Sequence, residues 1–316
     1  MRLLVLGGSA FVGRAVVEEG VARGYDVTTF NRGRGWAHPD ATALHGDRLD
    51  WPELAGEWDL VVDTWAQDPR AVQASAASLA ERAGRYVYIS SCSVYAPPPV
   101  MGADEHTPTV APEGEDYANV KRGGEVAVLA AFGDRATLLR PGLILGPHED
   151  VGRLPWWLLR LARGGDTLAP GPADLPLQLI DARDLAAFAI DASSGTYNSV
   201  SRRGHATMRS LLEAAREVTG TRATLRWIDP TILAQHDVEA WTELPIWLPP
   251  DHEYAALHGA NVEQAHAAGL TTRPAEETVA DTWAWLSALG DAPPQRADIP
   301  PHGIAPEKEQ AILQSI

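Results

Sequence analysis

The feature that most constrains the fold is the start of the chain, where a short apolar run meets two glycines. Residues 2–6 read RLLVL, and Gly7 and Gly8 follow directly. An apolar run of this length that stops at glycine is typical of a strand buried on both faces, the kind found in parallel sheets covered by helices. Residues 11–23 then carry valines at helical spacing. The chain therefore begins with a strand, a glycine turn and a helix.

Strand-like and helix-like segments continue to alternate through the first half of the chain. The strand-like segments are apolar or β-branched runs, and the helix-like segments are alanine-rich or carry apolar residues on one stripe. The expected strands are 26–30, 41–45, 59–65, 85–91 and 136–145, and the expected helices are 71–83 and 116–132. Regular alternation of this kind predicts an α/β protein made of βαβ units, with a doubly wound parallel sheet of the Rossmann type.

The second half of the chain is less regular and shows no such alternation. Strands are predicted at 195–200 and 223–228, and helices at 208–219 and 275–289. Residues from 291 onward are rich in proline and charge, a composition that predicts loose attachment to the folded part.

The glycine turn, GGSAFVG at residues 7–13, has the setting of a dinucleotide-binding loop. A turn between a strand and a helix presents backbone N–H groups and the positive end of the helix dipole to a diphosphate. Gly7 would permit the tight turn, and Gly13 would let the helix pack close to the sheet. Ala10 stands where a full glycine fingerprint has its middle glycine. The alternative is a glycine-rich turn that binds nothing, because a motif match by itself is a weak signal.

The end of the second strand bears on the choice of cofactor. It reads FNRGR at residues 30–34, with Asn31, Arg32 and Arg34 and no carboxylate. An acidic residue there binds the ribose 2′-hydroxyl of NAD, whereas an arginine accommodates the 2′-phosphate of NADP. The segment therefore favours NADP(H) over NAD(H), the alternative being two solvated loop arginines. After the third strand, Asp47 in the sequence GDR either bonds the adenine amino group or closes a plain turn.

A tyrosine and a lysine four residues apart lie on the predicted helix 116–132. Tyr117 and Lys121 share one face of such a helix, so the phenol and the ammonium can share a pocket. The ammonium favours the phenolate and lowers the pKa of the tyrosine, which makes the phenol a competent proton donor to a carbonyl oxygen. Serines at 90, 91 and 93 lie at the end of the strand 85–91, where ligands of a parallel sheet bind. The alternatives are a surface pair on the helix and serines that cap a turn.

At these residues the sequence resembles the extended and atypical short-chain dehydrogenase/reductases, the superfamily of nucleotide-sugar epimerases and dehydratases. Seven features match in order, and the match covers residues 1 to about 288. Two positions depart from the usual pattern, Ala10 in the glycine turn and Ala96 after SVY. The matching features are LGGSAFVG, GDR, DLVVDTW, ISSCSVY, YANVK with Glu125 following, RPGLILGP and QLIDARDLA.

The resemblance implies a division into domains. Residues 1–147, with returning segments near 178–200, would form the NAD(P)-binding Rossmann domain. Residues 148–177 and 201–290 would form a smaller C-terminal substrate lobe, and residues 291–316 the loosely attached tail.

The resemblance also implies the roles of the site residues. Ser91 would hold the substrate oxygen, Tyr117 would be the acid/base, and Lys121 would lower the pKa of Tyr117 and bind the nicotinamide ribose. The segment from Pro141 to Ile144 would flank the nicotinamide. No metal is expected, because no histidine and cysteine cluster has ligand spacing. The expected cofactor contacts are Gly7, Ser9, Ala10, Phe11, Val12, Gly13, Asn31, Arg32, Arg34, Asp47, Arg48, Trp65, Tyr117, Lys121, Pro141, Leu143 and Ile144.

The composition limits the partners and the compartment. The net charge of −16 repels nucleic acid and anionic membranes, so neither is an expected partner. The single cysteine, Cys92, forms no intrachain disulfide, and no apolar stretch has the length of a membrane span. We therefore expect a cytoplasmic protein that acts on a small molecule. Tryptophans at 156, 157, 227, 241 and 247 favour an aromatic substrate pocket or, in the alternative, a packed core.

Three functions fit these motifs. The first is an NADP(H)-dependent oxidoreductase, with carbonyl reductase or alcohol dehydrogenase chemistry on a small or medium metabolite. The second is an NAD-dependent nucleotide-sugar epimerase or dehydratase, as the superfamily implies. The third is a non-catalytic NAD(P)-binding sensor or RNA-associated protein, which the net charge of −16 and the complete serine, tyrosine and lysine set disfavour. The resemblance also leads us to expect a homodimer.

Overall fold

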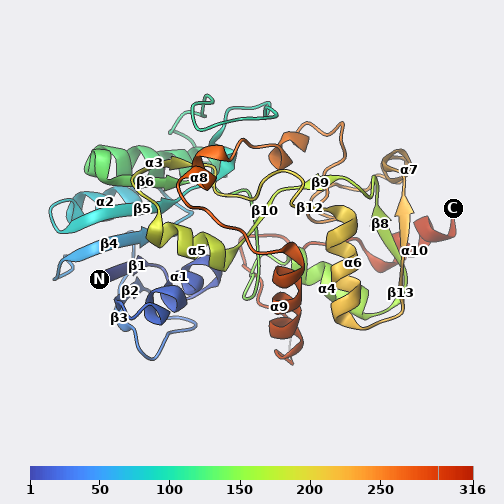
Figure 1. Cartoon of the computed structure of the whole chain (residues 1–316), viewed down its shortest axis with the longest axis horizontal. Coiled ribbons are helices and arrows are strands. Elements are labelled where there is room, and N and C mark those ends of the chain that lie inside the picture. The colour runs from blue at the N-terminus through green and yellow to red at the C-terminus, as the bar shows by residue number, and fades with distance from the viewer. Residues whose placement is uncertain (291, 316) are drawn as a thin grey trace. The chain divides into compact units, whose positions relative to one another are not determined.

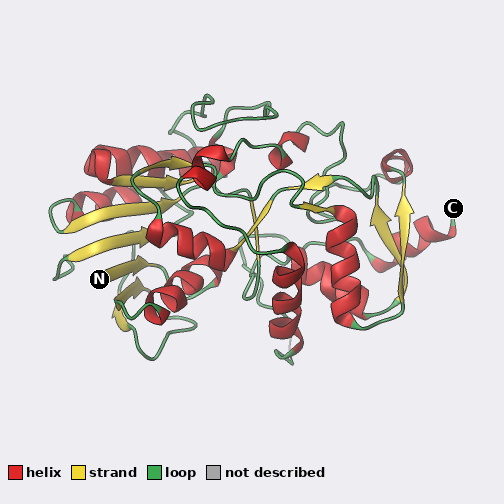
Figure 2. Cartoon of the chain, in the orientation of Figure 1, coloured by secondary structure: helices red, strands yellow, loops and turns green. Residues whose placement is uncertain are grey.

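The structure is a computed structural model that describes residues 1–290 and 292–315. The chain divides into two compact units, whose helices, strands and loops are distinguished in Figure 2. Unit 1 comprises Met1–Gly142, Ala182–Ser201 and Ala260–Thr272, and unit 2 comprises Leu143–Asp181, Arg202–Gly259 and Arg273–Ile316.

In the part of the chain that the structure describes, unit 1 contains a parallel sheet of seven strands in the order β11-β6-β5-β4-β1-β2-β3. This order confirms the predicted doubly wound α/β fold, because the chain starts near the middle of the sheet and winds outward in both directions. Helix α1 packs against α5, and α2 packs against α3 (Figure 1). The bounds are β1 Arg2–Leu6, α1 Phe11–Ala22, β2 Asp26–Asn31, β3 Thr42–His45, β4 Trp58–Asp63, α2 Arg70–Leu79, β5 Ala83–Ile89, α3 Tyr117–Phe132, β6 Ala136–Leu139, α5 Ala182–Asp191 and β11 Gly195–Tyr197.

The central strand β1 is buried on both faces, as its near-continuous apolar sequence predicts. On one face Leu4 belongs to a core cluster with Val72 of α2 and Val128 of α3. On the other face Leu3 packs so closely on α1 that a Cβ at Gly20 would lie 2.6 Å from its Cδ2 atom. Helices therefore cover both faces and hold the carboxyl ends of the strands in fixed positions.

The predicted strand 136–145 is two strands instead of one. Strand β6 ends at Leu139, and β7 (Leu143–Leu145) pairs with β10 (Leu179–Asp181), both in unit 2. Pro141 lies between β6 and β7. Proline has no backbone N–H for a sheet ladder, so the apolar run cannot continue as one strand.

Residues 260–272 belong to unit 1, whereas the sequence assigned them to the substrate lobe. The segment includes α8 (Glu263–Ala267). The Asn198 side chain donates to the carbonyl of Asn261 at 2.8 Å, and the Gln264 side chain donates to that of Thr196 at 2.8 Å. These bonds join residues 63 and 68 positions apart, so no local pattern could reveal them.

Unit 2 has a core rich in tryptophan, around which the helices α4, α6 and α9 pack. Strand β8 pairs in parallel with β13, and β9 pairs antiparallel with β12. Trp157 and Trp247 are buried, and each indole N–H donates to a backbone carbonyl at 2.8 Å. These two tryptophans are therefore core residues. The bounds are α4 Arg153–Ala162, β8 Gly165–Pro170, β9 Pro176–Leu177, β12 Ala206–Thr207, α6 Met208–Thr219, β13 Ala223–Ile228, α7 Pro230–Gln235 and α9 Ala275–Ser287.

The tail, which the sequence predicted to be loosely attached, is anchored on unit 2. Helix α10 (Pro306–Gln314) packs on β8 and buries Ile312. Its Glu309 is buried and accepts from the Arg160 guanidinium, with 2.7 Å between Oε2 and Nε. The prediction of loose attachment was wrong because it took charges in a proline-rich segment to be solvated. The carboxylate of Glu309 instead pairs with the buried Arg160. Positions 291 and 316 of the predicted tail lie outside the described residues.

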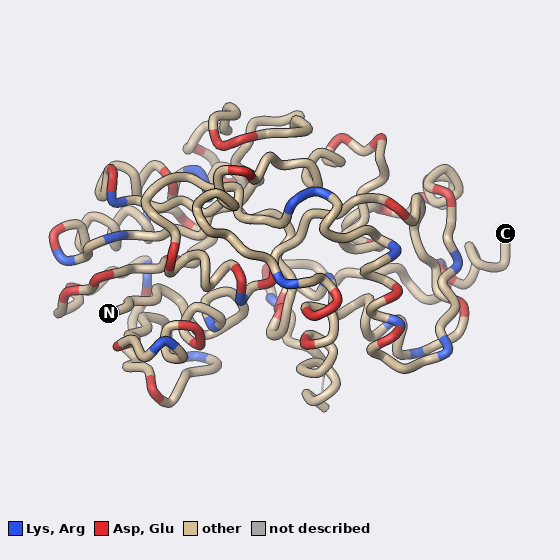
Figure 3. The backbone as a smooth tube through the Cα atoms, in the orientation of Figure 1, with Lys and Arg blue, Asp and Glu red and all other residues tan. Residues whose placement is uncertain are grey.

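The 42 acidic and 26 basic residues are interspersed along both units (Figure 3). Among residues 1–290 and 292–315, no helix has both the length and the apolar character that crossing a membrane requires.

Candidate active site

The glycine turn connects β1 to α1 in the way its sequence predicts. Gly7 has a φ of +122°, and a Cβ there would lie 2.5 Å from Oγ1 of Thr64. A Cβ at Gly13 would lie 2.7 Å from the backbone nitrogen of Gly8. Both positions therefore require glycine, one for its backbone conformation and both for space. Of the other predicted contacts in the turn, Ala10 is exposed, Ser9 and Phe11 are half-buried and Val12 is buried.

The end of β2 is fastened to this turn by Asn31. Its side-chain nitrogen donates to the carbonyl of Gly7 at 3.0 Å, and its side-chain oxygen accepts from the N–H of Gly33 at 2.8 Å. Arg32 and Arg34 are exposed. The structure thus brings the two predicted arginines next to the glycine turn through Asn31, and leaves both guanidinium groups accessible.

Asp47 and Arg48, neighbours in sequence, have different surroundings. Asp47 is exposed, and its carboxylate accepts from the N–H of Leu49 at 2.9 Å. Arg48 is only 4% exposed, and its guanidinium forms two hydrogen bonds with Asp63, at 2.9 and 2.8 Å. The guanidinium of Arg48 therefore bonds within unit 1, and these bonds do not support the predicted contact between Arg48 and the cofactor.

Tyr117 is the first residue of α3, and Lys121 follows one helical turn later. Tyr117 is 51% exposed, whereas Lys121 is 3% exposed. The Lys121 ammonium donates to the carbonyl of Trp65 at 2.7 Å and to that of Ile89 at 2.6 Å. Two strand ends therefore hold the buried ammonium one helical turn from an accessible phenol.

Tyr88 lies beside this pair. The Lys121 Nζ is 4.9 Å from the centre of the Tyr88 ring, and the Tyr88 hydroxyl donates to the carbonyl of Trp65 at 3.0 Å. Burial raises the pKa of Tyr88 well above its ordinary value, with smaller contributions from the charges of Asp63 and Tyr117. A Cβ at Gly124 would lie 2.5 Å from the Tyr88 hydroxyl, so glycine at this position lets α3 approach.

Two adjacent serines follow β5 and have separate partners. Ser90 donates to the carboxylate of Glu125 at 2.7 Å and is buried. Ser91 begins the short helix η1 (Cys92–Val94), where its hydroxyl accepts from the N–H of Ser93 at 3.1 Å. The Ser91 hydroxyl also donates to the Ser93 hydroxyl at 3.1 Å, so both serines have partners within the protein.

Sequence reasoning assigned no role to Glu125 and Arg140, which form a buried ion pair. The Arg140 guanidinium bonds both oxygens of Glu125, at 2.8 and 2.9 Å, and their exposures are 4% and 0%. Burial by itself would raise the pKa of Glu125, but Arg140 and the Ser90 hydroxyl outweigh it and lower the pKa. The pair ties α3 to the residue after β6. Its signal in the sequence was the position of Glu125, one helical turn after Lys121.

The last predicted contacts follow β6. Pro141 is buried, and its carbonyl accepts from the N–H of Cys92 at 3.0 Å, which places it beside the turn that holds Ser91. In unit 2, Leu143 and Ile144 belong to β7, where Leu143 is buried and Ile144 is half-buried.

A doubly wound parallel sheet, a glycine turn after β1, a serine after β5 and a tyrosine–lysine pair on α3 are the features expected of a nicotinamide-dependent Rossmann enzyme. Residues 70–198 match the model of the NAD dependent epimerase/dehydratase family. The match agrees with the resemblance seen in the motifs.

Known proteins similar to this chain fall into two groups. One is a 2-alkyl-3-oxoalkanoate reductase from Stenotrophomonas maltophilia, 35% identical over 183 residues, which are 48% of this chain and 53% of the reductase. The chain thus spans about half the length of this curated relative. The other group consists of solved structures with the same fold.

Two of these structures illustrate the likeness. The Bordetella bronchiseptica enzyme WbmH in complex with NAD+ is 18% identical, with a TM-score of 0.67 over 92% of this chain and 99% of that one. The UDP-glucose 4-epimerase of Thermotoga maritima with UDP-glucose is 17% identical, with a TM-score of 0.65 over 92% and 100% of the two chains. At these identities the likeness shows the fold alone.

Proposed function

We propose that the protein is an NADP(H)-dependent oxidoreductase that reduces a carbonyl group or oxidises an alcohol on a small or medium metabolite, with Tyr117 as general acid/base. The observation that carries the proposal is the buried Lys121 ammonium, held by the carbonyls of Trp65 and Ile89 one helical turn from the accessible Tyr117 phenol. A buried ammonium beside a phenol favours the phenolate, which suits proton transfer near neutral pH.

The residues of the glycine turn fit a dinucleotide. A Cβ would clash with Thr64 at Gly7 and with the backbone of Gly8 at Gly13. Because both residues are glycines, the turn packs closely on α1 and its backbone N–H groups can approach a diphosphate. Asp47 would lie at the adenine end and Pro141 at the nicotinamide end. The bound nicotinamide supplies or accepts the hydride.

The protein's own side chains would divide the remaining work. Tyr117 donates a proton to the substrate oxygen during reduction and accepts it back during oxidation. The Ser91 hydroxyl donates a hydrogen bond to the same oxygen and holds it near the phenol. Lys121 stabilises the phenolate and binds the nicotinamide ribose.

We further propose that NADP(H) is the preferred cofactor. Arg32 and Arg34 are exposed beside the glycine turn, and β2 ends in Asn31, whose amide is engaged with Gly7 and Gly33. A guanidinium pairs well with a 2′-phosphate, and no carboxylate stands at this strand end for a 2′-hydroxyl.

The relative from Stenotrophomonas maltophilia suggests the first substrates to try. Its name is that of a reductase for a 3-oxo acid with a 2-alkyl substituent. A panel of 3-oxo acids and simple ketones would therefore be assayed first, by following oxidation of NADPH and of NADH.

A nucleotide-sugar epimerase or dehydratase is the second candidate, because structures of such enzymes share this fold. An enzyme of that kind regenerates its NAD within each cycle and keeps it bound. Mass spectrometry of the purified protein separates the candidates: copurified NAD would favour the epimerase, whereas exchangeable NADP would favour the oxidoreductase.

The test of the catalytic role is Tyr117→Phe. The change removes one hydroxyl from a half-exposed side chain, so the fold and the cofactor affinity should persist. Turnover should fall by about 100- to 10,000-fold, the usual contribution of general acid catalysis. The control is Tyr254→Phe, which alters a tyrosine 41% exposed in unit 2. A Tyr117→Phe enzyme with wild-type kcat, when chemistry limits the rate, would contradict the assignment.

We also propose that the protein is cytoplasmic and forms a homodimer. Cell fractionation checks the first, and light scattering of the purified protein checks the second.

A further inference from the structure

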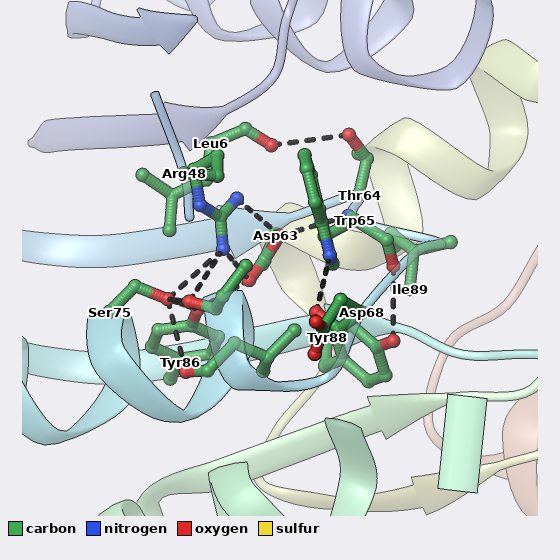
Figure 4. A network of polar contacts seen from close by, with 12 residues as sticks. Leu6, Arg48, Asp63, Thr64, Trp65, Asp68, Ser75, Tyr86, Tyr88 and Ile89 are labelled. Atoms are coloured by element: carbon green, nitrogen blue, oxygen red, sulfur yellow. Dashed lines mark hydrogen bonds and ion pairs between the residues drawn. The ribbon is translucent and has the colours of Figure 1, made fainter. Parts of the chain in front are cut away.

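A buried ion pair lies at the carboxyl end of β4, two residues before Trp65, whose carbonyl accepts from Lys121. Asp63 is the last residue of β4 and is 0% exposed. The Arg48 guanidinium donates to both carboxylate oxygens of Asp63, at 2.9 and 2.8 Å. It also donates to the Ser75 hydroxyl of α2 at 3.0 Å (Figure 4). An arginine from the loop after β3 therefore reaches across to β4 and α2.

The same carboxylate has two further donors. The Tyr86 hydroxyl donates to Oδ2 at 2.6 Å, and the backbone N–H of Trp65 donates to Oδ1 at 2.9 Å. Burial by itself would raise the pKa of Asp63, but Arg48, Tyr86 and the Trp65 N–H outweigh it and lower the pKa. Asp63 is thus a charged acceptor that holds the backbone N–H of Trp65.

The Trp65 carbonyl continues the path to the active site. It accepts from the Lys121 ammonium at 2.7 Å and from the Tyr88 hydroxyl at 3.0 Å (Figure 4 shows the latter bond). The Trp65 indole N–H donates to the carbonyl of Asp68 at 2.8 Å, which holds the side chain of the same residue. Trp65 is therefore clamped at its N–H by Asp63 and at its indole by Asp68, and it presents its carbonyl to Lys121.

We propose that Arg48 is a positioning residue for Lys121: the Arg48–Asp63 ion pair fixes Trp65, whose carbonyl holds the Lys121 ammonium beside Tyr117. The inference rests on the proposed function of Lys121. A contribution to the free energy of unfolding does not by itself explain why this ion pair is present. A buried ion pair often stabilises a protein no more than apolar side chains of the same volume would. Hydrogen bonds between two charged side chains do, however, fix the orientation of both side chains, which apolar contacts do not.

The experiment reads the phenol of Tyr117 directly and needs no substrate. The ultraviolet absorbance of tyrosinate is titrated against pH in each variant, and the titration of the same variant with Tyr117→Phe is subtracted. The difference belongs to Tyr117. Affinity for NADPH, measured by quenching of tryptophan fluorescence, and thermal unfolding are recorded on the same samples.

The main variant is the double change Arg48→Met and Asp63→Leu. It removes both charges together, because removing Arg48 alone would leave a buried carboxylate unpaired and could unfold unit 1. We expect the protein to fold and the pKa of Tyr117 to rise, because a displaced Lys121 ammonium stabilises the phenolate less. The rise should stay below that of Lys121→Met, which loses the opposite charge outright and should raise the pKa by about one unit or more. Arg48→Lys keeps the charge but not the two-pronged geometry, so it should give a smaller rise.

The matched control is the double change Arg160→Met and Glu309→Leu. This pair is also buried, with its closest N–O contact at 2.7 Å against 2.8 Å for Arg48–Asp63, but it lies in unit 2 between α4 and α10. We expect a similar change in thermal unfolding and no change in the Tyr117 titration. An equal rise in the control would overturn the proposal, because the effect would then follow from any buried pair.

Lys121→Met separates this proposal from the function on which it rests. If Lys121→Met raises the pKa of Tyr117 and the folded Arg48→Met/Asp63→Leu protein titrates like wild type, Arg48 does not position Lys121 and the proposed function stands. If Lys121→Met leaves the titration unchanged, the lysine does not act on Tyr117, and both proposals fail.

Discussion

Gly13→Ala tests the glycine turn with the smallest possible change. The new Cβ would lie 2.7 Å from the backbone nitrogen of Gly8 and 3.1 Å from its Cα. The clash is with backbone, which cannot rotate away as a side chain can. To restore an ordinary contact of 3.4 Å, the turn and the start of α1 must separate by about 0.7 Å.

The size of the effect follows from this displacement. Forcing an extra methyl into a packed site costs about 1–3 kcal/mol, and alanine in place of glycine in a helix returns roughly 1 kcal/mol. The net loss of stability for Gly13→Ala is therefore at most about 2 kcal/mol, and the domain stays folded. Losing one charge-assisted hydrogen bond to the diphosphate costs about 1.5–3 kcal/mol, so cofactor affinity should fall by roughly 10- to 100-fold.

Gly20→Ala provides the matched control on the same helix. Its Cβ would meet the Cδ2 of Leu3 at 2.6 Å and the Cγ2 of Val27 at 3.0 Å, and both are ends of side chains that can move. We expect a stability change of about 1 kcal/mol or less and no change in affinity. Calorimetric titration with NADPH and NADH, with thermal unfolding alongside, measures both quantities. A folded Gly13→Ala protein with wild-type affinity for both cofactors would refute the assignment of the turn.

Two further predictions concern cofactor choice and pH. Arg32→Asp should weaken NADP binding by about 10- to 100-fold and improve NAD binding, and wild-type protein that already prefers NAD in titrations would contradict the assignment. Glu149, buried at the start of α4, has its pKa raised by burial from 4.5 to about 7. Because the folded pKa lies above the unfolded one, its contribution to the free energy of unfolding is full below pH 4.5 and falls by roughly 3 kcal/mol as pH rises through about 7. Glu149→Gln should remove this pH dependence. Urea unfolding of both proteins between pH 4.5 and about 7 measures it, and an identical pH dependence in the two proteins would contradict the prediction.

Local patterns were enough to predict the scaffold and the parts of the site that lie on one element. The strands at 2–6 and 223–228 and the helix at 208–219 have the bounds that apolar runs and spacing predicted. The shared face of Tyr117 and Lys121 likewise follows from helical geometry, because it depends on a spacing of four residues. Such signals are complete within one or two turns of chain, so the sequence by itself contains them.

The partners of those residues were decided only by the tertiary structure. Arg48 looked like a ligand-binding arginine because its partners, Asp63 and Ser75, are 15 and 27 residues away and meet it only when parallel strands bring their carboxyl ends together. The tail that contains Glu309 looked loosely attached because the partner of Glu309, Arg160, is 149 residues distant. A charge in a sequence does not reveal whether water or another charge will surround it. That outcome depends on which distant segment packs beside it, and the fold alone determines this.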